Sequence, residues 1–204
     1  MILGFVALTM GVSAQARESI VNINQLKDQA AKAGWTAREN WVSKMSREEI
    51  RRMLGSTEQP TTSLDMDGFS AMGAAGSLDW RNMNGINYVG PMLNQGNCGS
   101  CVAFAAVAAV ETQLSIASGL PWLRPTFSTQ NLFACGGGGC DSGWQPESAA
   151  RFIREDGLVD EACSPYTSGS SGEDVSCSTV CSDAKDRTFF ANGYHRPSNG
   201  WGSN

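Results

Sequence analysis

The chain has 204 residues, of which 41% are hydrophobic and 17% charged, and its formal net charge is -5. With 15 Lys and Arg against 20 Asp and Glu and no basic block, the sequence lacks the positive surface that binds a phosphate backbone, so nucleic acid is excluded as a partner. The apolar content is too high for a disordered chain, and no apolar run reaches the roughly 20 residues that span a bilayer. These values predict a globular protein with no membrane contact in its mature form.

The amino-terminal residues 1–16 form an apolar run that ends in an A-x-A triplet, Ala14-Gln15-Ala16, as secretory signal peptides do. No Lys or Arg precedes the run, which leaves a buried helix as the alternative. All seven cysteines lie between positions 98 and 181, and this usage is typical of an oxidising compartment. We therefore expect a signal peptide over residues 1–16 and a protein that is secreted or resides in the lysosome or vacuole.

Two short helices are predicted in the next part of the chain. Asn24 is expected to cap a helix over residues 25–33, and Ser46 with Glu49 forms a capping box that opens a second helix. Residues 56–76 are rich in Ser, Thr, Gly and Ala and show no periodicity, so they read as a linker open to proteolysis.

The strongest helix signal follows the linker. Residues 101–118 read CVAFAAVAAVETQLSIAS and are followed by Gly119, which predicts a helix that is apolar on nearly every face and therefore buried. Shorter helices are predicted over residues 129–134 and 146–156. Residues 188–204 are expected to begin a strand.

The string QGNCGSC at residues 95–101 precedes this helix and carries the candidate chemistry. A cysteine at a helix start lies at the positive end of the helix dipole, which favours the nucleophilic thiolate, and unpaired backbone N–H groups there can hold an oxyanion. Gln95 offers a side-chain amide that the glycine-containing turn can bring to the same point. Cys101 and Gln95 are thus the candidate nucleophile and oxyanion donor.

On this string the chain resembles the papain-like cysteine peptidases, whose signature is C-G-[SA]-C followed by an aromatic residue. The resemblance implies that Cys101 is the nucleophile and that Gln95 forms the oxyanion hole, although Val102 replaces the usual aromatic. It also implies an α+β, two-domain papain-like fold, of which this chain contains mainly the helical half-domain while the β-barrel half is largely missing.

A second motif supports the resemblance. Residues 139–144, GCDSGW, are similar to the G-C-x-G-G loop of the family, whose last Gly lines the substrate cleft and whose following aromatic borders the specificity pocket. Gly143 and Trp144 take these roles by resemblance. Ser142 replaces the first Gly of the pair, and we expect it to alter how the substrate backbone is held.

Removing Cys101 from the seven cysteines leaves six, which permit fifteen pairings. The pattern resembles the cathepsin B branch of the family, which has a Cys-x-Pro-Tyr motif and a later C-x3-C. By that resemblance the bridges are Cys98–Cys140, Cys135–Cys177 and Cys163–Cys181.

The resemblance also implies an organisation and a set of partners. Residues 17–76 are expected to be a helical pro-segment with an activation linker, and residues 77–204 a partial catalytic domain. Residues 168–176 contain no His of the cathepsin B occluding loop, which favours endopeptidase action. The implied partners are peptide or protein substrates and the chain's own pro-segment, with a monomeric enzyme and no metal or cofactor.

In this family the base His and its orienting Asn follow the nucleophile by roughly 130 to 150 residues. The only histidine, His195, follows Cys101 by 94 positions (195 minus 101) in a context unlike the family motif, so it is not assigned as the base. We expect the chain to be an amino-terminal fragment that is inactive as given.

Three alternatives remain open. The Cys98-x-x-Cys101 spacing is compatible with a thioredoxin-like redox pair. A zinc site is compatible with Cys98, Cys101, Cys135 and Cys140. The rival of another class is a non-catalytic, disulfide-stapled binding module or an inactive peptidase paralogue.

Overall fold

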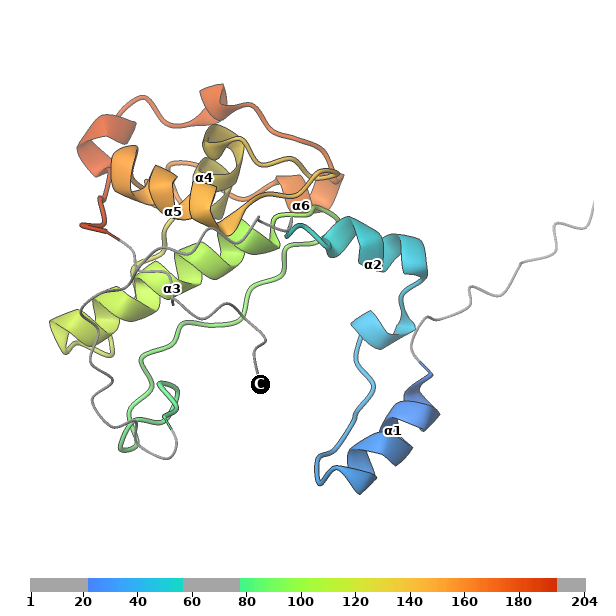
Figure 1. Ribbon diagram of the computed structural model, residues 1–204. Helices are drawn as coiled ribbons and strands as arrows, with labels where there is room; N and C mark the ends of the chain where they lie inside the picture. The colour runs from blue at the N-terminus through green and yellow to red at the C-terminus, as the bar shows by residue number, and fades with distance from the viewer. Residues whose placement is uncertain (1–21, 57–77, 194–204) are drawn as a thin grey trace, which may run out of the picture. The chain divides into compact units, whose positions relative to one another are not determined.

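The computed structural model describes residues 22–56 and 78–193, and the chain divides into two compact units, residues 1–50 and 51–204 (Figure 1). The expected signal peptide, the linker beyond residue 56 and His195 lie outside the described residues. Each unit is described by itself.

The first unit opens with helix α1 (Ile23–Lys32). Its cap is Asn22, whose side-chain Oδ1 accepts a hydrogen bond from the backbone N–H of Gln25 at 3.1 Å. The prediction of Asn24 as the cap was therefore wrong by two positions. Either asparagine suits a cap by its chemistry, and the extended backbone of Asn22 places its side chain to bond the first turn.

A 3-10 turn, η1 (Val42–Lys44), leads into helix α2 (Arg47–Met53). The predicted capping box is confirmed: the Ser46 N–H donates to Glu49 Oε2 at 2.7 Å, and the Glu49 N–H donates to Ser46 Oγ at 3.3 Å. The two reciprocal bonds satisfy donors that an open helix start leaves without partners.

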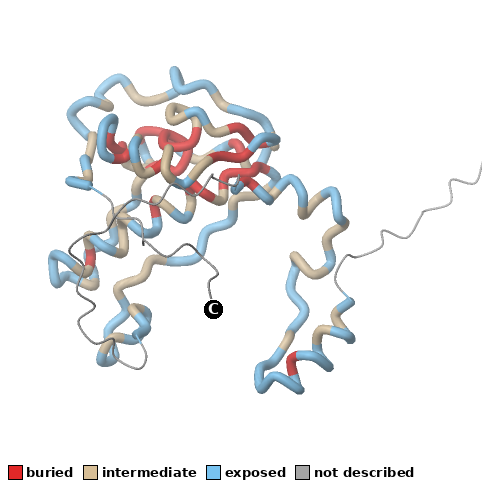
Figure 2. The backbone as a smooth tube through the Cα atoms, viewed as in Figure 1, coloured by how far each residue is buried: buried red, intermediate tan, exposed pale blue. Residues whose placement is uncertain are grey.

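The second unit is built on helices α3 (Cys101–Ser118), α4 (Thr129–Gly136) and α5 (Pro146–Glu155), which pack against one another. In Figure 2 the buried backbone gathers where these three helices meet. The core side chains there are Cys98, Val102, Ala103, Val107, Leu132, Phe133, Cys140, Trp144, Ala149, Ile153 and Leu158. Short helical turns follow at α6 (Ser168–Ser171), η2 (Cys177–Thr179) and η3 (Ala184–Arg187).

Helix α3 has the predicted bounds and ends at Gly119, which adopts a left-handed conformation with φ 66°. The prediction that this helix is buried was wrong in extent. Of its 18 residues, all of which the structure describes, only Val102, Ala103, Val107 and Ser115 are buried. Within the described part of the chain, α3 is long and apolar enough to cross a membrane by length and composition alone, a test that core helices also pass. An all-apolar helix was expected to be covered on every side, whereas α4 and α5 cover one side of it.

No strand is assigned within residues 22–56 and 78–193, where pairing is limited to isolated bridges. The strand expected from residue 188 amounts to one antiparallel bridge, in which Leu158 and Phe189 exchange two backbone hydrogen bonds of 2.8 Å each. The fold is accordingly the mainly helical half-domain that the resemblance implied.

All three expected disulfides are present, and Cys101 is the free cysteine. Two bridges span 42 residues and the third spans 18. Together they connect the turn before α3, α4 and the segments after it, and the carboxy-terminal turns. The bridges thus fix the connections between short helices that have a small common core.

Candidate active site

Cys101 is the first residue of α3 and is partly exposed. The preceding residue, Ser100, occupies the N-cap position, but its side chain makes no capping hydrogen bond. The first turn of an α-helix carries N–H groups without intrahelical acceptors. The thiol of Cys101 therefore lies beside backbone donors of the kind that stabilise an oxyanion.

The turn that leads into α3 is fixed by covalent and hydrogen bonds to the loop at Cys140. Cys98 is fully buried and bridged to Cys140, and the N–H of Gly99 donates to the Cys140 carbonyl at 2.9 Å. A Cβ at Gly99 would lie only 2.6 Å from that same carbonyl oxygen. Glycine is therefore required at position 99 for the two loops to approach so closely.

Gln95 lies next to this turn, as the sequence predicted. Its side-chain Nε2 donates at 2.8 Å to the carbonyl of Cys98 and at 2.8 Å to the carbonyl of Met53. The two protons of the amide are thus both engaged. The bond to Cys98 holds the amide close to the start of α3, and the bond to Met53 occupies the donor that an oxyanion would use.

The loop around Gly143 forms the opposite side of the candidate site. The N–H of Gly143 donates to the carbonyl of Gly139 at 2.7 Å, and Gly143 has φ 70°. Ser142 is exposed, and its side chain folds back over Gly139. The backbone N–H of Cys140 donates to Asp174 Oδ1 at 2.7 Å, a contact for which the sequence gave no signal.

The side chain and the backbone of Trp144 lie in different environments. Its indole is 6% exposed and packs edge-on against Phe133, with ring centroids 6.4 Å apart. A Cβ at Gly136 would also meet the indole ring. Its backbone N–H instead donates to the carbonyl of Gly55 at 2.6 Å. The backbone of Trp144 faces the site, while its side chain belongs to the core.

Residues 51–56 belong to the same compact unit as these loops. Ser56 pairs with Trp144 in an isolated parallel bridge. A Cβ at Gly55 would overlap the carbonyl of Gly99, and a Cβ at Gly143 would overlap the carbonyl of Gly55. The end of α2 and the residues after it therefore lie between the turn before α3 and the 143–144 loop.

The disulfides weigh against two of the alternatives. Cys98 pairs with Cys140, so it is not a partner for Cys101 in a redox pair. The candidate zinc set loses three of its four ligands because Cys135 is also bridged. Within the described residues no group of three or more metal-ligating side chains comes together.

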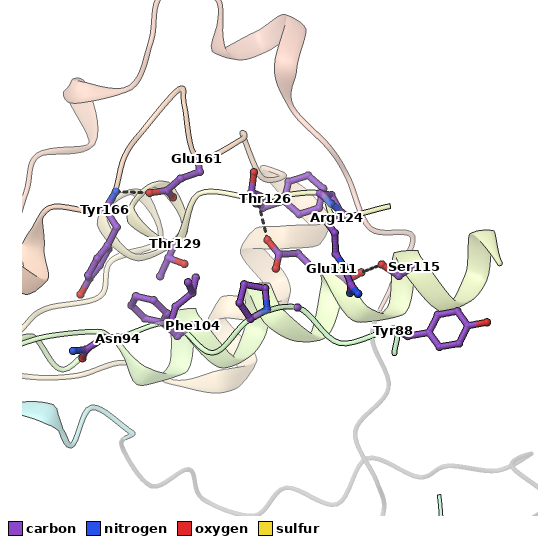
Figure 3. A pocket seen from close by; sticks show the side chains of 15 residues that line it. Tyr88, Asn94, Phe104, Glu111, Ser115, Arg124, Thr126, Thr129, Glu161 and Tyr166 are labelled. Atoms are coloured by element: carbon purple, nitrogen blue, oxygen red, sulfur yellow. Dashed lines mark hydrogen bonds between the residues drawn. The ribbon is translucent and has the colours of Figure 1, made fainter. Parts of the chain in front are cut away.

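A separate pocket of about 300 Å³ lies over the middle of α3 and has Phe104, Glu111, Arg124, Glu161 and Tyr166 among its lining residues (Figure 3). Burial raises the pKa of Glu111; a hydrogen bond from the Phe127 N–H opposes this rise, and the nearby Glu161 carboxylate adds to it. Burial also raises the pKa of Glu161. The lining does not include Cys101 or Gln95, so this pocket is distinct from the candidate active site.

A family model described as papain family cysteine protease matches residues 74–199. Among curated proteins, cathepsin B-like CP3 of Giardia intestinalis is 38% identical over 119 residues, covering 57% of this chain and 39% of that protein. Cathepsin J of Mus musculus is 31% identical over 164 residues, covering 78% of this chain and 46% of that protein. The chain thus spans less than half the length of these two relatives.

Solved structures give the same result for the fold. Procathepsin L 3 of the Tenebrio molitor larval midgut superposes with a TM-score of 0.60 at 26% identity, covering 82% of this chain and 52% of that one. Procathepsin B S9 from Trypanosoma congolense superposes with a TM-score of 0.64 at 21% identity, covering 84% and 62%. Both similarities extend beyond the 74–199 segment.

Proposed function

The chain belongs to the papain family of cysteine proteases, and from this premise we propose that it is part of the zymogen of a cysteine endopeptidase. Cys101 attacks the scissile carbonyl of a peptide, and the acyl-enzyme that forms is hydrolysed by water. The Gln95 amide and the backbone N–H groups at the start of α3 stabilise the tetrahedral oxyanion. The observation that carries the proposal is the convergence of these groups on one turn, held by the Cys98–Cys140 bridge.

The imidazole that activates the thiol and protonates the leaving amine comes, in this proposal, from a part of the protease other than the described residues. The single histidine of the sequence, His195, lies outside them. We propose secretion or a lysosomal or vacuolar location, a monomeric enzyme and peptide or protein substrates.

We propose that the arrangement of residues 51–56 described above is that of the inhibited zymogen. Two features support this: the Met53 carbonyl accepts from the Gln95 amide, and Gly55 bonds the Trp144 backbone. A substrate cannot bond the Gln95 amide in the same way while Met53 remains there. We propose that residues 17–76 are the pro-segment, with cleavage in the linker after residue 56 preceding release.

The peptidase role is tested on the mature full-length protease, freed of its pro-segment, with a fluorogenic peptide amide. Cys101→Ser is expected to abolish turnover, and Gln95→Ala is expected to lower kcat by about 10²–10³-fold, the usual effect of removing one oxyanion donor. Gln113→Ala is the matched control, because it removes the same amide from an exposed position of α3. Absence of hydrolysis by the unsubstituted mature protease would favour the non-catalytic binding module.

The inhibited state is tested by adding a synthetic peptide of residues 22–56 to the same mature protease. Competitive inhibition is expected, because the peptide carries both the Met53 carbonyl and the Gly55 contact. A peptide that ends at residue 50 is the control, since it lacks both. Equal inhibition by the two peptides would show that the contacts of Met53 and Gly55 do not cause the inhibition.

A further inference from the structure

We propose that Tyr166 is a positioning residue for peptide hydrolysis, one that holds Gln95 and the start of α3 in register through its hydroxyl. The inference rests on the proposed peptidase function and adds to it a residue 71 positions away from Gln95 in the sequence. Tyr166 lies in the loop that the Cys163–Cys181 bridge closes, and this loop contacts the candidate active site at Gln95.

The hydroxyl of Tyr166 makes two short contacts. Its oxygen lies 2.9 Å from the backbone carbonyl of Gln95 and 2.6 Å from Ser100 Oγ. A carbonyl only accepts, so Tyr166 donates its single proton to Gln95, and the Ser100 hydroxyl therefore donates to Tyr166. The three residues form one directed chain of hydrogen bonds that starts at Ser100, beside Cys101, and ends at the Gln95 carbonyl.

The burial of Ser100 shows why this chain of hydrogen bonds stabilises the start of α3. Its side chain is fully buried and is not used to cap α3, and its other acceptor, the Cys98 carbonyl, is 3.5 Å away. A buried hydroxyl that loses its partner destabilises its surroundings. Tyr166 supplies that partner at the residue immediately before the nucleophile.

Tyr166 is itself held rigidly. Its ring packs edge-on against Phe104 of α3, with centroids 4.8 Å apart, and its backbone N–H donates to Glu161 Oε1 at 2.8 Å (Figure 3). Burial raises the pKa of the phenol, although the Ser100 hydrogen bond opposes this. The group therefore stays protonated and remains a donor at neutral pH.

The backbone around Gln95 also packs closely against Gly169. The Asn97 N–H donates to the Gly169 carbonyl at 2.9 Å, and a Cβ at Gly169 would lie 2.7 Å from the Tyr166 ring and 3.0 Å from the Gln95 carbonyl carbon. Gln95 is thus fixed at both ends: Tyr166 holds its carbonyl, and Cys98 holds its amide. An oxyanion donor is effective only when it is pre-oriented in this way.

The test uses the mature full-length protease without its pro-segment. Tyr166→Phe keeps the ring contact with Phe104 and removes only the hydroxyl, and it is expected to lower kcat about tenfold with KM within twofold. Alkylation of Cys101 by iodoacetamide, which forms no oxyanion, is expected to keep its rate. Tyr88→Phe is the matched control, since it removes a phenol hydroxyl elsewhere in the unit, and it is expected to change neither quantity.

A double-mutant cycle with Gln95→Ala decides between positioning and a merely structural role. If Tyr166 acts through Gln95, Tyr166→Phe has no further effect on kcat once Gln95 is alanine. A full tenfold loss in that background, an unchanged kcat in the single variant, or a parallel fall in alkylation would each overturn the proposal.

Two further arms keep the test decisive. If Tyr166→Phe does not fold, Ser100→Ala is measured instead; it removes the donor to the Tyr166 hydroxyl and is expected to show the same pattern with a smaller loss, and no loss overturns the proposal. If the unsubstituted protease alkylates at Cys101 but hydrolyses no peptide, the proposed function itself fails and the positioning role with it.

Discussion

Two segments meet at Gln95, and they are held in different ways. The turn at residues 95–101 is tied by a disulfide, by fully buried side chains at Cys98 and Ser100, and by the hydroxyl of Tyr166. The segment at residues 51–56, which contains the end of α2, contacts the site through backbone carbonyls that accept from Gln95 and Trp144 and through the close approach of Gly55 to Gly99. In the proposed zymogen, the first segment is a fixed framework and the second is released with the pro-segment.

The difference shows how a site can be assembled before it is used. The groups to which we assign the chemistry are fixed by bonds that do not depend on residues 51–56, apart from the one proton of the Gln95 amide that Met53 accepts. Removal of residues 51–56 would therefore free a donor without dismantling the turn. Four measurements would break or sharpen this contrast.

The largest effect concerns the chain as given, which contains both segments. We expect the 204-residue chain to hydrolyse peptide amides at no more than the background rate, because the Met53 carbonyl occupies the Gln95 amide and because an activated thiol needs a base that also protonates the leaving amine. Turnover of a fluorogenic peptide and the rate of alkylation by iodoacetamide are measured side by side, and alkylation at Cys101 should persist. Robust hydrolysis would assign the base to His195 or another group of this chain.

The second test removes the covalent tie of the framework. Replacing Cys98 and Cys140 together by serine opens a 42-residue loop and is expected to lower the free energy of unfolding by about 2–4 kcal/mol. Urea unfolding under non-oxidising conditions measures the loss. The control replaces Cys163 and Cys181 by serine, which opens a loop of 18 residues and should lower the free energy of unfolding by a similar amount. Only the replacement of Cys98 and Cys140 should change the alkylation rate of Cys101.

The third test weakens the contacts of residues 51–56. Gly55→Ala in the peptide of residues 22–56 is expected to weaken its inhibition of the mature protease by at least about tenfold, or about 1.4 kcal/mol, because the new Cβ would overlap the Gly99 carbonyl. Leu54→Ala is the control, since Leu54 is 70% exposed. Inhibition constants compare the three peptides, and equal values for all of them would place Gly55 outside the cleft.

The smallest effect is a pH dependence away from the site. Because the folded-state pKa of Glu111 is raised, the folded state binds the proton more tightly than the unfolded state, and stability falls as pH rises from the unfolded pKa through the folded one. Glu111→Gln keeps an acceptor for the Phe127 N–H and should stabilise the chain slightly at pH 7 and not at pH 4. Thermal unfolding at the two values measures this, and a stabilisation confined to pH 4 would contradict it.

The parts of the fold that the sequence predicted depend on local chemistry. The bounds of α3 follow from Gly119, which supplies the left-handed conformation that ends a helix. The Ser46–Glu49 capping box needs only residues three apart. The disulfide pairing came from a family resemblance, since spacing alone left fifteen choices open.

The parts that were missed depend on contacts between distant segments. The Met53 carbonyl reaches Gln95 across 42 positions, and a backbone carbonyl leaves no signature in a sequence. Tyr166 ends the Cys-x-Pro-Tyr motif, which served only to indicate the branch of the family, and only the structure shows which groups its hydroxyl bonds. The burial of α3 was overestimated because apolar residues predict that a face is covered without saying which segment covers it.

The three disulfide loops overlap in sequence, each one opening before the previous one has closed: 98–140, 135–177 and 163–181. A chain that enters an oxidising compartment from its amino terminus therefore exposes Cys98 and Cys101 together, about forty residues before Cys140 arrives. During that interval their nearest thiol partner is each other, and a premature Cys98–Cys101 bond would consume the nucleophile. Reaching the native pairing then requires thiol–disulfide exchange, so the yield of the folded protein should depend on the isomerase capacity of the compartment that folds it.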